Sequence, residues 1–179
     1  MKLSALSILL GLSVAASGIW AILKPNEFGA AARKFPRSVS WGYLLVALAT
    51  GWFLYYLSIE SVSDFAAYKP AMYMGFSALG VLTCIFLEDF LAARGLAVVL
   101  LLLAKAMLDA SMFNDSQWRL LISVWAYVLI VAGMWITVSP WRLRDFIQFG
   151  TASDGRIKFL GGFRLGFGLL VAILGVVAF

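Results

Sequence analysis

The chain contains no histidine and only one cysteine, Cys84, which lies within an apolar run. Histidine is the usual axial ligand of haem, the commonest transition-metal ligand and the base of serine–histidine triads. A single cysteine cannot form an internal disulfide. These absences argue against a haem protein, a histidine-based metal site, a triad hydrolase and a disulfide framework. We therefore expect a protein without cofactor or bound metal that is not an enzyme.

Charge and proline are also scarce. Only 13% of the residues are charged and 63% are hydrophobic, whereas soluble domains are about one-quarter charged and half apolar. The four prolines lie at the ends of apolar runs or between them, so none interrupts a run. Many transporters instead contain broken helices at the membrane midplane. The composition indicates an integral membrane protein and favours unbroken helices.

Six apolar runs are long enough to cross a bilayer. Each has roughly 18–22 residues, or about 27–33 Å of helix, which matches a hydrocarbon core. The predicted spans are 3–23, 41–58, 70–87, 91–112, 118–138 and 159–179. The sequence thus predicts an all-α integral membrane fold over residues 1–179, a single transmembrane domain whose six helices form three hairpins.

The first run has two interpretations. Its start at Met1–Lys2 and its small residues at 15–18 also fit a secretory signal peptide. The length of the run and Trp20 near its end, where an interfacial anchor belongs, favour a retained span. Ser7, Gly11 and Ala15 are four residues apart, so they share one helix face and predict a close helix contact.

Two long connectors, 24–40 and 139–158, carry most of the positive charge. We expect a short interfacial helix from Glu27 to Lys34, an amphipathic start to the second connector, and a flexible point at Thr151–Gly155. Ten lysines and arginines fall on the side of these connectors, namely Lys24, Arg33, Lys34, Arg37, Arg94, Arg142, Arg144, Arg156, Lys158 and Arg164. Four fall on the other side, namely Lys2, Lys69, Lys105 and Arg119. By the positive-inside rule the connectors are cytoplasmic and both termini face outward.

The first and second long connectors begin in the same way. GIWAILKP at 18–25 and GMWITVSP at 133–140 share glycine, tryptophan and proline at an offset of 115. This match suggests a parallel internal repeat of helices one and two in helices five and six. The alternative is that interfacial tryptophan and a proline after a helix are common features that coincide here.

The second copy carries a further pattern: Pro140 followed by Trp141, arginines in the connector, and a glycine-rich final helix. From Gly133 to Gly175 the chain resembles a family of small two-helix bacterial inner-membrane proteins of unknown function. The resemblance covers under a quarter of the chain. It implies a membrane hairpin in a bacterial inner membrane and no particular activity.

Few residues within the spans could carry chemistry. Lys105 and Asp109 lie four apart, so they can form an intramembrane charge pair or, alternatively, an interfacial pair in which the lysine reaches outward. Gly162 and Gly166 have GxxxG spacing and predict a helix-packing face. Arg164, about five residues into the last span, is a candidate contact for a lipid phosphate or a partner carboxylate, or reaches the headgroups by snorkelling.

Two functions follow from this pattern. The first is a scaffold or accessory subunit that packs against other membrane proteins or itself and is surrounded by lipid. In this case its connectors, through Arg33, Lys34, Arg142 and Arg144, contact anionic headgroups or an acidic partner. The alternative is a transporter or channel for a small solute or ion. Because the mid-membrane positions are almost wholly apolar, we expect a solid bundle without a pore, and no site for nucleic acid.

Overall fold

The computed structural model describes residues 3–60, 67–87, 89–112 and 114–179, and these contain helices and no strand. The long helices are α1 (Leu3–Leu23), α3 (Val39–Ile59), α4 (Lys69–Phe86), α5 (Leu91–Met112), α6 (Arg119–Val138) and α8 (Asp154–Val177). Between them lie the short helices α2 (Pro25–Lys34), η1 (Phe35–Arg37) and α7 (Pro140–Gly150). All six long helices are long and apolar enough to cross a membrane, which confirms the predicted all-α class. Lys2, counted above, lies outside the described residues.

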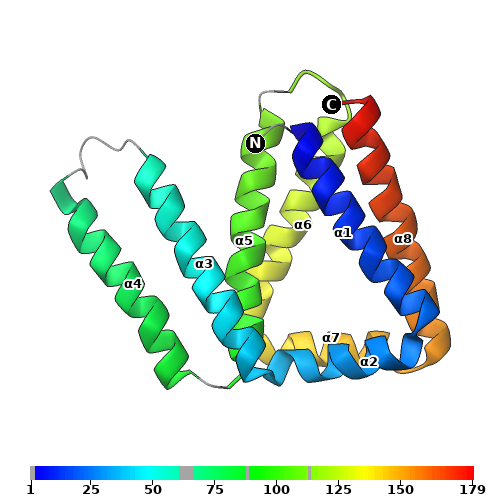
Figure 1. Cartoon of the computed structure of the whole chain (residues 1–179), viewed down its shortest axis with the longest axis horizontal. Coiled ribbons are helices and arrows are strands. Elements are labelled where there is room, and N and C mark those ends of the chain that lie inside the picture. The colour runs from blue at the N-terminus through cyan, green and yellow to red at the C-terminus, as the bar shows by residue number, and fades with distance from the viewer. Residues whose placement is uncertain (1–2, 61–66, 88, 113) are drawn as a thin grey trace.

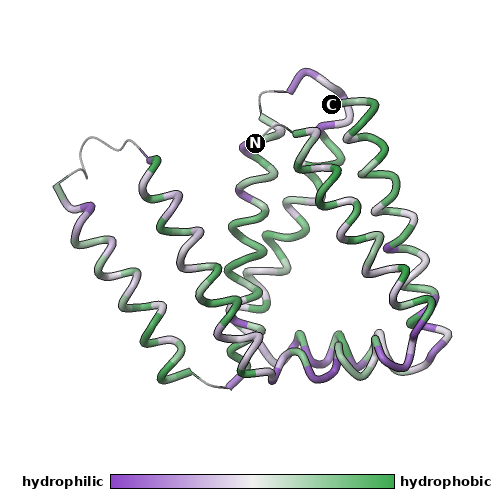
Figure 2. The backbone as a smooth tube through the Cα atoms, viewed as in Figure 1, coloured by the Kyte–Doolittle hydropathy of each residue, from purple (hydrophilic) through white to green (hydrophobic). Residues whose placement is uncertain are grey.

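Successive long helices run in alternating directions. Both termini lie at one end of the molecule, and α2 and α7 lie across the opposite end, side by side and transverse to the long helices (Figure 1). Hydrophilic residues gather along these two short helices and at the helix ends, whereas the long helices are mostly hydrophobic (Figure 2). We call the end formed by α2, η1 and α7 the basic rim.

The pairing of the helices differs from the predicted hairpins. The most extensive contact joins α1 to α8, the two ends of the chain, and the next joins α5 to α6. Helix α3 packs against both α5 and α4. The expected partners α1 with α3, α4 with α5, and α6 with α8 are absent from the extensive contacts of the described residues. Three packed hairpins are therefore not confirmed, because the closest pair brings together helices that are remote in sequence.

Small residues explain the α1–α8 contact. Ser7, Gly11 and Ala15 are buried, which confirms the close helix face predicted for the first run. A Cβ built on Gly11 would lie 2.5 Å from the backbone N of Ala172, and one on Gly168 would lie 2.5 Å from the backbone N of Ala15. Only glycine at these two positions allows the backbones to approach so closely.

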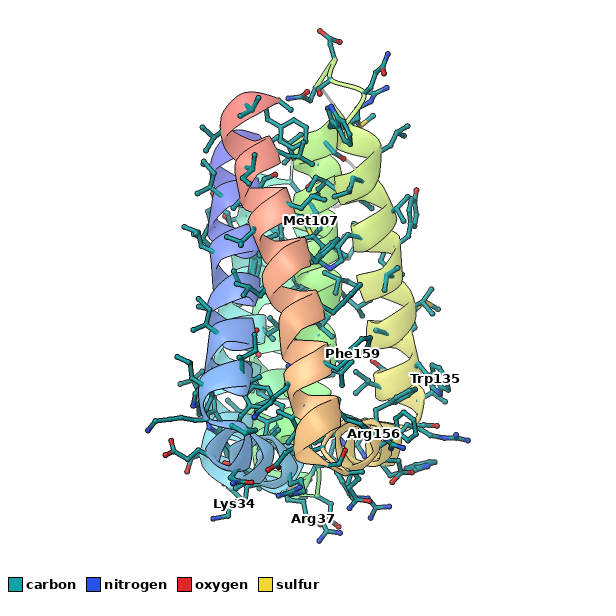
Figure 3. The ribbon with its side chains drawn as sticks, turned by 90° about the vertical axis from the view of Figure 1, so that its right-hand side faces the viewer. Lys34, Arg37, Met107, Trp135, Arg156 and Phe159 are labelled. Atoms are coloured by element: carbon teal, nitrogen blue, oxygen red, sulfur yellow. The ribbon has the colours of Figure 1, made fainter. Side chains whose placement is uncertain are left out.

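The main core lies at the end of the molecule that holds the termini. It is built from Leu3, Leu6 and Leu10 of α1, Ala104 and Met107 of α5, Ile122 and Ala126 of α6, and Val171 of α8. Met107 lies between the helices in Figure 3. From this core the α1–α8 pair and the α5–α6 pair diverge toward the basic rim (Figure 1). Two hollows lie on the rim side of the core, and the absence of a through-going pore stays a prediction.

The last span begins earlier than predicted. Helix α8 starts at Asp154, because the side chain of Ser153 accepts a hydrogen bond from the backbone N–H of Arg156 and Asp154 places a negative charge in the first turn. The expected flexible point is also ordered: Thr151 is buried, and its Oγ1 donates to the carbonyl of Ile147 at 2.7 Å.

The two connector starts have nearly the same backbone geometry. Lys24 has φ −134° and ψ 67°, and Ser139 has φ −136° and ψ 74°. Each is followed by a proline in the first turn of a short helix, where a missing N–H is harmless. Each backbone N–H donates to a tryptophan carbonyl four residues earlier, at 2.9 Å and 2.8 Å respectively. Each thus turns the chain from a long helix into one lying across the rim, and we call the two sites the elbows.

Candidate functional site

The basic rim concentrates charge of one sign. Arg33, Lys34 and Arg142 are exposed, and Lys34, Arg37 and Arg156 lie at this end of the molecule in Figure 3. Some cations have acidic partners: Lys24 pairs with Glu27 at 2.9 Å, and Arg144 pairs with the adjacent Asp145 at 2.9 Å. Lys34 and Arg142 are in no ion pair among the described residues. The rim can therefore attract anionic groups.

Arg33 has a structural contact as well as a charge. Its Nη1 donates to the carbonyl of Thr151 at 3.0 Å, which connects α2 to the link between α7 and α8. Nearby, a Cβ on Gly29 would lie 3.1 Å from Cδ1 of Ile157, so α2 also lies close to the first turn of α8. These contacts hold the two short helices together as one platform.

A hollow of about 260 Å³ lies above this platform, between α2, α7 and α8. Its lining includes Phe28, Leu143, Phe146 and Arg164. A second hollow of about 580 Å³, on the face shared by α6 and α7, has Leu143 and Phe146 in common with the first. Aside from Arg142 and Tyr127, the larger hollow is lined by apolar side chains. Both hollows are lined mostly by apolar side chains and lie next to each other beside the diverging helices.

Arg164 lies about where the sequence placed it. It is ten residues after the start of α8, or about 15 Å along the helix, but the helix begins with the polar turn 154–158, so Arg164 is five residues into the apolar run. It is half-buried, and its guanidinium carbon lies 5.4 Å from the ring centre of Phe28 on α2. The ring of Phe28 thus interacts with part of the guanidinium that water would otherwise contact. Arg164 forms no ion pair among the described residues. The arginine therefore presents an unneutralised charge to the smaller hollow.

Arg94 is a second candidate site, and the sequence indicates it only as one of the positive charges on the connector side. In the structure it lines a separate cavity of about 280 Å³ between α3, α4 and α5. Its Nε is buried and has no hydrogen-bond partner among the described residues. The only signal in the sequence is the neighbouring Gly95, where an added Cβ would lie 2.8 Å from the Cβ of Leu45 on α3, so that a larger residue would push the two helices apart.

Lys105 and Asp109 do form the predicted pair, with Nζ and Oδ2 3.0 Å apart. The side chains are 46% and 53% exposed, so the pair faces away from the core. Lys105 also lies 4.9 Å from the ring centre of Tyr56 on α3. Neither charge lines any of the hollows described above, so the pair is an outward-facing one near the end of α5 that lies away from the rim.

The predicted glycine face is wrong for packing within the chain. A Cβ on Gly162 or Gly166 would meet no atom within 4 Å, and both residues are exposed. The contact with α1 instead uses Gly161, Gly168 and Gly175, which are buried and spaced seven apart. The signal was present in the sequence, but GxxxG spacing selected the wrong side of α8.

Within the described ranges no three histidine, cysteine, aspartate or glutamate side chains are grouped so as to hold a metal ion. No protein-family model, curated protein or solved structure matches the chain. The resemblance of the C-terminal part to small two-helix inner-membrane proteins therefore stays a prediction. The site is defined by this chain's own geometry: a basic rim, two neighbouring hollows beside it, and a separate cavity at Arg94.

Proposed function

We propose that the protein is a non-enzymatic, multi-pass subunit of a bacterial inner-membrane complex, in which it acts as a scaffold for another membrane protein. The observation that carries this proposal is the position of α4. Among the described residues it packs extensively only against α3, and Gly80 is its only buried residue. A span attached by one face leaves the rest of its surface for lipid, a partner subunit or a second copy of the chain.

The basic rim supports a second contact in the same complex. Lys34 and Arg142 extend from neighbouring short helices and lack described acidic partners. Exposed cations at the cytoplasmic surface of a membrane attract anionic headgroups or an acidic segment of a partner. The positive-inside rule would place this rim in the cytoplasm and both termini outside.

The elbows support an origin by duplication. Both elbows have similar backbone angles, a hydrogen bond to a tryptophan carbonyl and a proline in the next position. The two segments therefore match in structure as well as in the three identical residues. Each tryptophan also meets a phenylalanine of its own short helix edge to face, Trp20 with Phe28 and Trp135 with Phe146. In this proposal α1–α2 and α6–α7 are parallel copies whose short helices together form the rim.

Transport of a small solute or ion is the second candidate, and one observation favours it. Arg164 places a charge beside a hollow within the candidate span α8, and ionisable residues in spans often mark solute pathways. The Lys105–Asp109 pair gives less support, because it faces outward.

Purification under mild detergent tests the subunit proposal. We expect a stoichiometric membrane partner to be retained by the wild type and lost from the double variant Lys34→Gln/Arg142→Gln. Lys69→Gln/Arg119→Gln removes the same charge at the opposite end and should retain the partner. Solute or ion flux in proteoliposomes containing this chain alone, abolished by Arg164→Gln, would instead establish a transporter.

A further inference from the structure

We propose that the cavity between α3, α4 and α5 binds an anionic phospholipid, with the lipid phosphate against Arg94 and one acyl chain inside the cavity. The site is separate from the hollows at α7 and α8 and does not depend on the subunit proposal. It would be present in a single chain.

The first argument is the state of the Arg94 side chain. Its Nε is buried, and neither a hydrogen bond nor an ion pair neutralises the guanidinium among the described residues. A buried charged donor without an acceptor is strongly unfavourable. A phosphate satisfies a guanidinium particularly well, because two parallel N–H groups can donate to two of its oxygens. Arg94 is therefore suited to bind an anion.

The second argument is the chemistry of the cavity walls. The apolar walls are formed by Val46, Ala49, Phe53, Phe76, Leu79, Gly80, Gly95 and Val98. Thr50 and Thr83 are the other polar lining residues, and the hydroxyl of Thr83 already donates to the carbonyl of Leu79 at 2.7 Å. A free phosphate would have one charged partner and mostly apolar surroundings. A phospholipid matches both the charge of Arg94 and the apolar walls, because its phosphate binds the guanidinium and its acyl chain is buried against the walls.

The third argument is depth. Arg94 lies three residues after the start of α5, about 4.5 Å along the helix, at the end of the molecule that holds the basic rim. Lipid headgroups lie at this level, where arginines near helix ends contact them. The rings of Phe53 and Phe76, 4.5 Å apart, contact each other farther from the rim. The headgroup would thus lie at the rim and the acyl chain would extend toward the aromatic pair.

The cavity is also accessible from the bilayer. Val98 and Leu79 line it and are 40% and 61% exposed, so their outer surfaces face the surroundings of the molecule. A lipid could enter sideways between α4 and α5, whose mutual contact in the described residues is slight. No rearrangement of the α3–α5 contact would be required.

Lipid binding to the purified full-length chain tests the proposal. Native mass spectrometry would follow titration with phosphatidylglycerol and, separately, phosphatidylcholine. We expect preferential binding of phosphatidylglycerol, weakened about tenfold by Arg94→Gln because a hydrogen-bonded charge pair is lost. Lys158→Gln removes an exposed charge at the same end without touching the cavity and should change binding less than twofold.

A second variant separates the cavity from the charge. Val98→Phe fills the opening while Arg94 is unchanged, so it should weaken phosphatidylglycerol binding several-fold. This variant also tests the proposal if Arg94→Gln fails to fold. Wild-type affinity in Val98→Phe would overturn the proposal. Equal losses in Arg94→Gln and Lys158→Gln would mean diffuse attraction by surface charge. Displacement of the lipid by inorganic phosphate at similar concentrations would indicate a simple anion site.

Discussion

At the residue scale, the small residues that let the backbones of α1 and α8 approach each other have the clearest effect on the structure. Gly11 and Gly18 on α1 lie against Gly168 and Gly161 on α8. A Cβ on Gly11, Gly18 or Gly168 would overlap with backbone atoms, and one on Gly161 would be tightly packed. In a bilayer, helices gain little from burying apolar side chains against each other, because lipid is equally apolar. Close backbone packing therefore supplies much of the specificity of this contact.

Substitution of two glycines on opposite sides of α8 tests this packing. We expect Gly168→Val to lower the free energy of unfolding by about 1–3 kcal/mol or more, since overpacking a tight contact forces the helices apart. Gly166→Val is the matched control and should have little effect, because its Cβ meets no atom within 4 Å. Thermal unfolding in detergent measures both. Equal destabilisation would contradict the assigned face.

The Lys105–Asp109 pair should contribute little to stability. Both side chains are about half exposed, and an exposed i, i+4 pair typically contributes about 0.3–0.5 kcal/mol. A double-mutant cycle with Lys105→Gln and Asp109→Asn in detergent is expected to give a coupling energy of that size. A coupling of several kcal/mol would show that detergent or lipid, and not water, surrounds the pair.

At the element scale, the two elbows decide where the charges of the connectors lie. Each proline-started helix turns across the end of the bundle, so that α2 and α7 lie next to each other although they are remote in sequence (Figure 1). The platform is joined to the start of α8 through Arg33 and Thr151. Arg33 therefore has a structural role that the neighbouring Lys34 lacks.

This difference predicts unequal effects of two adjacent substitutions. Arg33→Gln should lower the free energy of unfolding by about 1–3 kcal/mol, because the Thr151 carbonyl loses a charged donor. Lys34→Gln removes the same charge from an exposed position and should change stability by less than about 0.5 kcal/mol. Thermal unfolding of both variants in one detergent provides the comparison. Similar losses would mean that net charge, not the hydrogen bond, matters.

At the scale of the whole molecule, the arrangement is an asymmetric set of helix pairs. The four-helix core lies toward the termini, the helices diverge toward the rim, and α4 stands at the edge beside α3 (Figure 1). Both termini and the 114–118 link lie at one end, whereas the links at 24–38 and 139–153 lie at the other. This alternation fits six crossings of a membrane.

Cysteine labelling tests the six crossings. In a Cys84→Ala background, Ala152→Cys and Gln117→Cys place exposed thiols at opposite ends of the molecule. A membrane-impermeant reagent applied to intact cells should label Gln117→Cys and reach Ala152→Cys only after permeabilisation, since the rim is expected in the cytoplasm. Labelling of both thiols in intact cells would contradict the topology.

The sequence by itself determined the helical class, the six long helices and the short helix of the first connector. Length, hydropathy and proline positions are local properties, and in lipid every backbone N–H and C=O of a span must be satisfied within its own helix. The small-residue face of α1 was predictable for the same reason, since Ser7, Gly11 and Ala15 recur with the helical period.

Only the tertiary structure decided which helices are partners and which arginines have enclosed surroundings. All six spans are apolar on most faces, so their sequences do not specify whether α1 packs against α3 or α8. The contact with α8 depends on the fit between two glycine-rich surfaces 150 residues apart, and GxxxG spacing alone selected Gly162 and Gly166 instead of Gly161 and Gly168. Arg94 became a candidate site for the same reason, and Arg164, already a candidate, gained a hollow beside it: a cavity arises from three helices together, and no single helix encodes it.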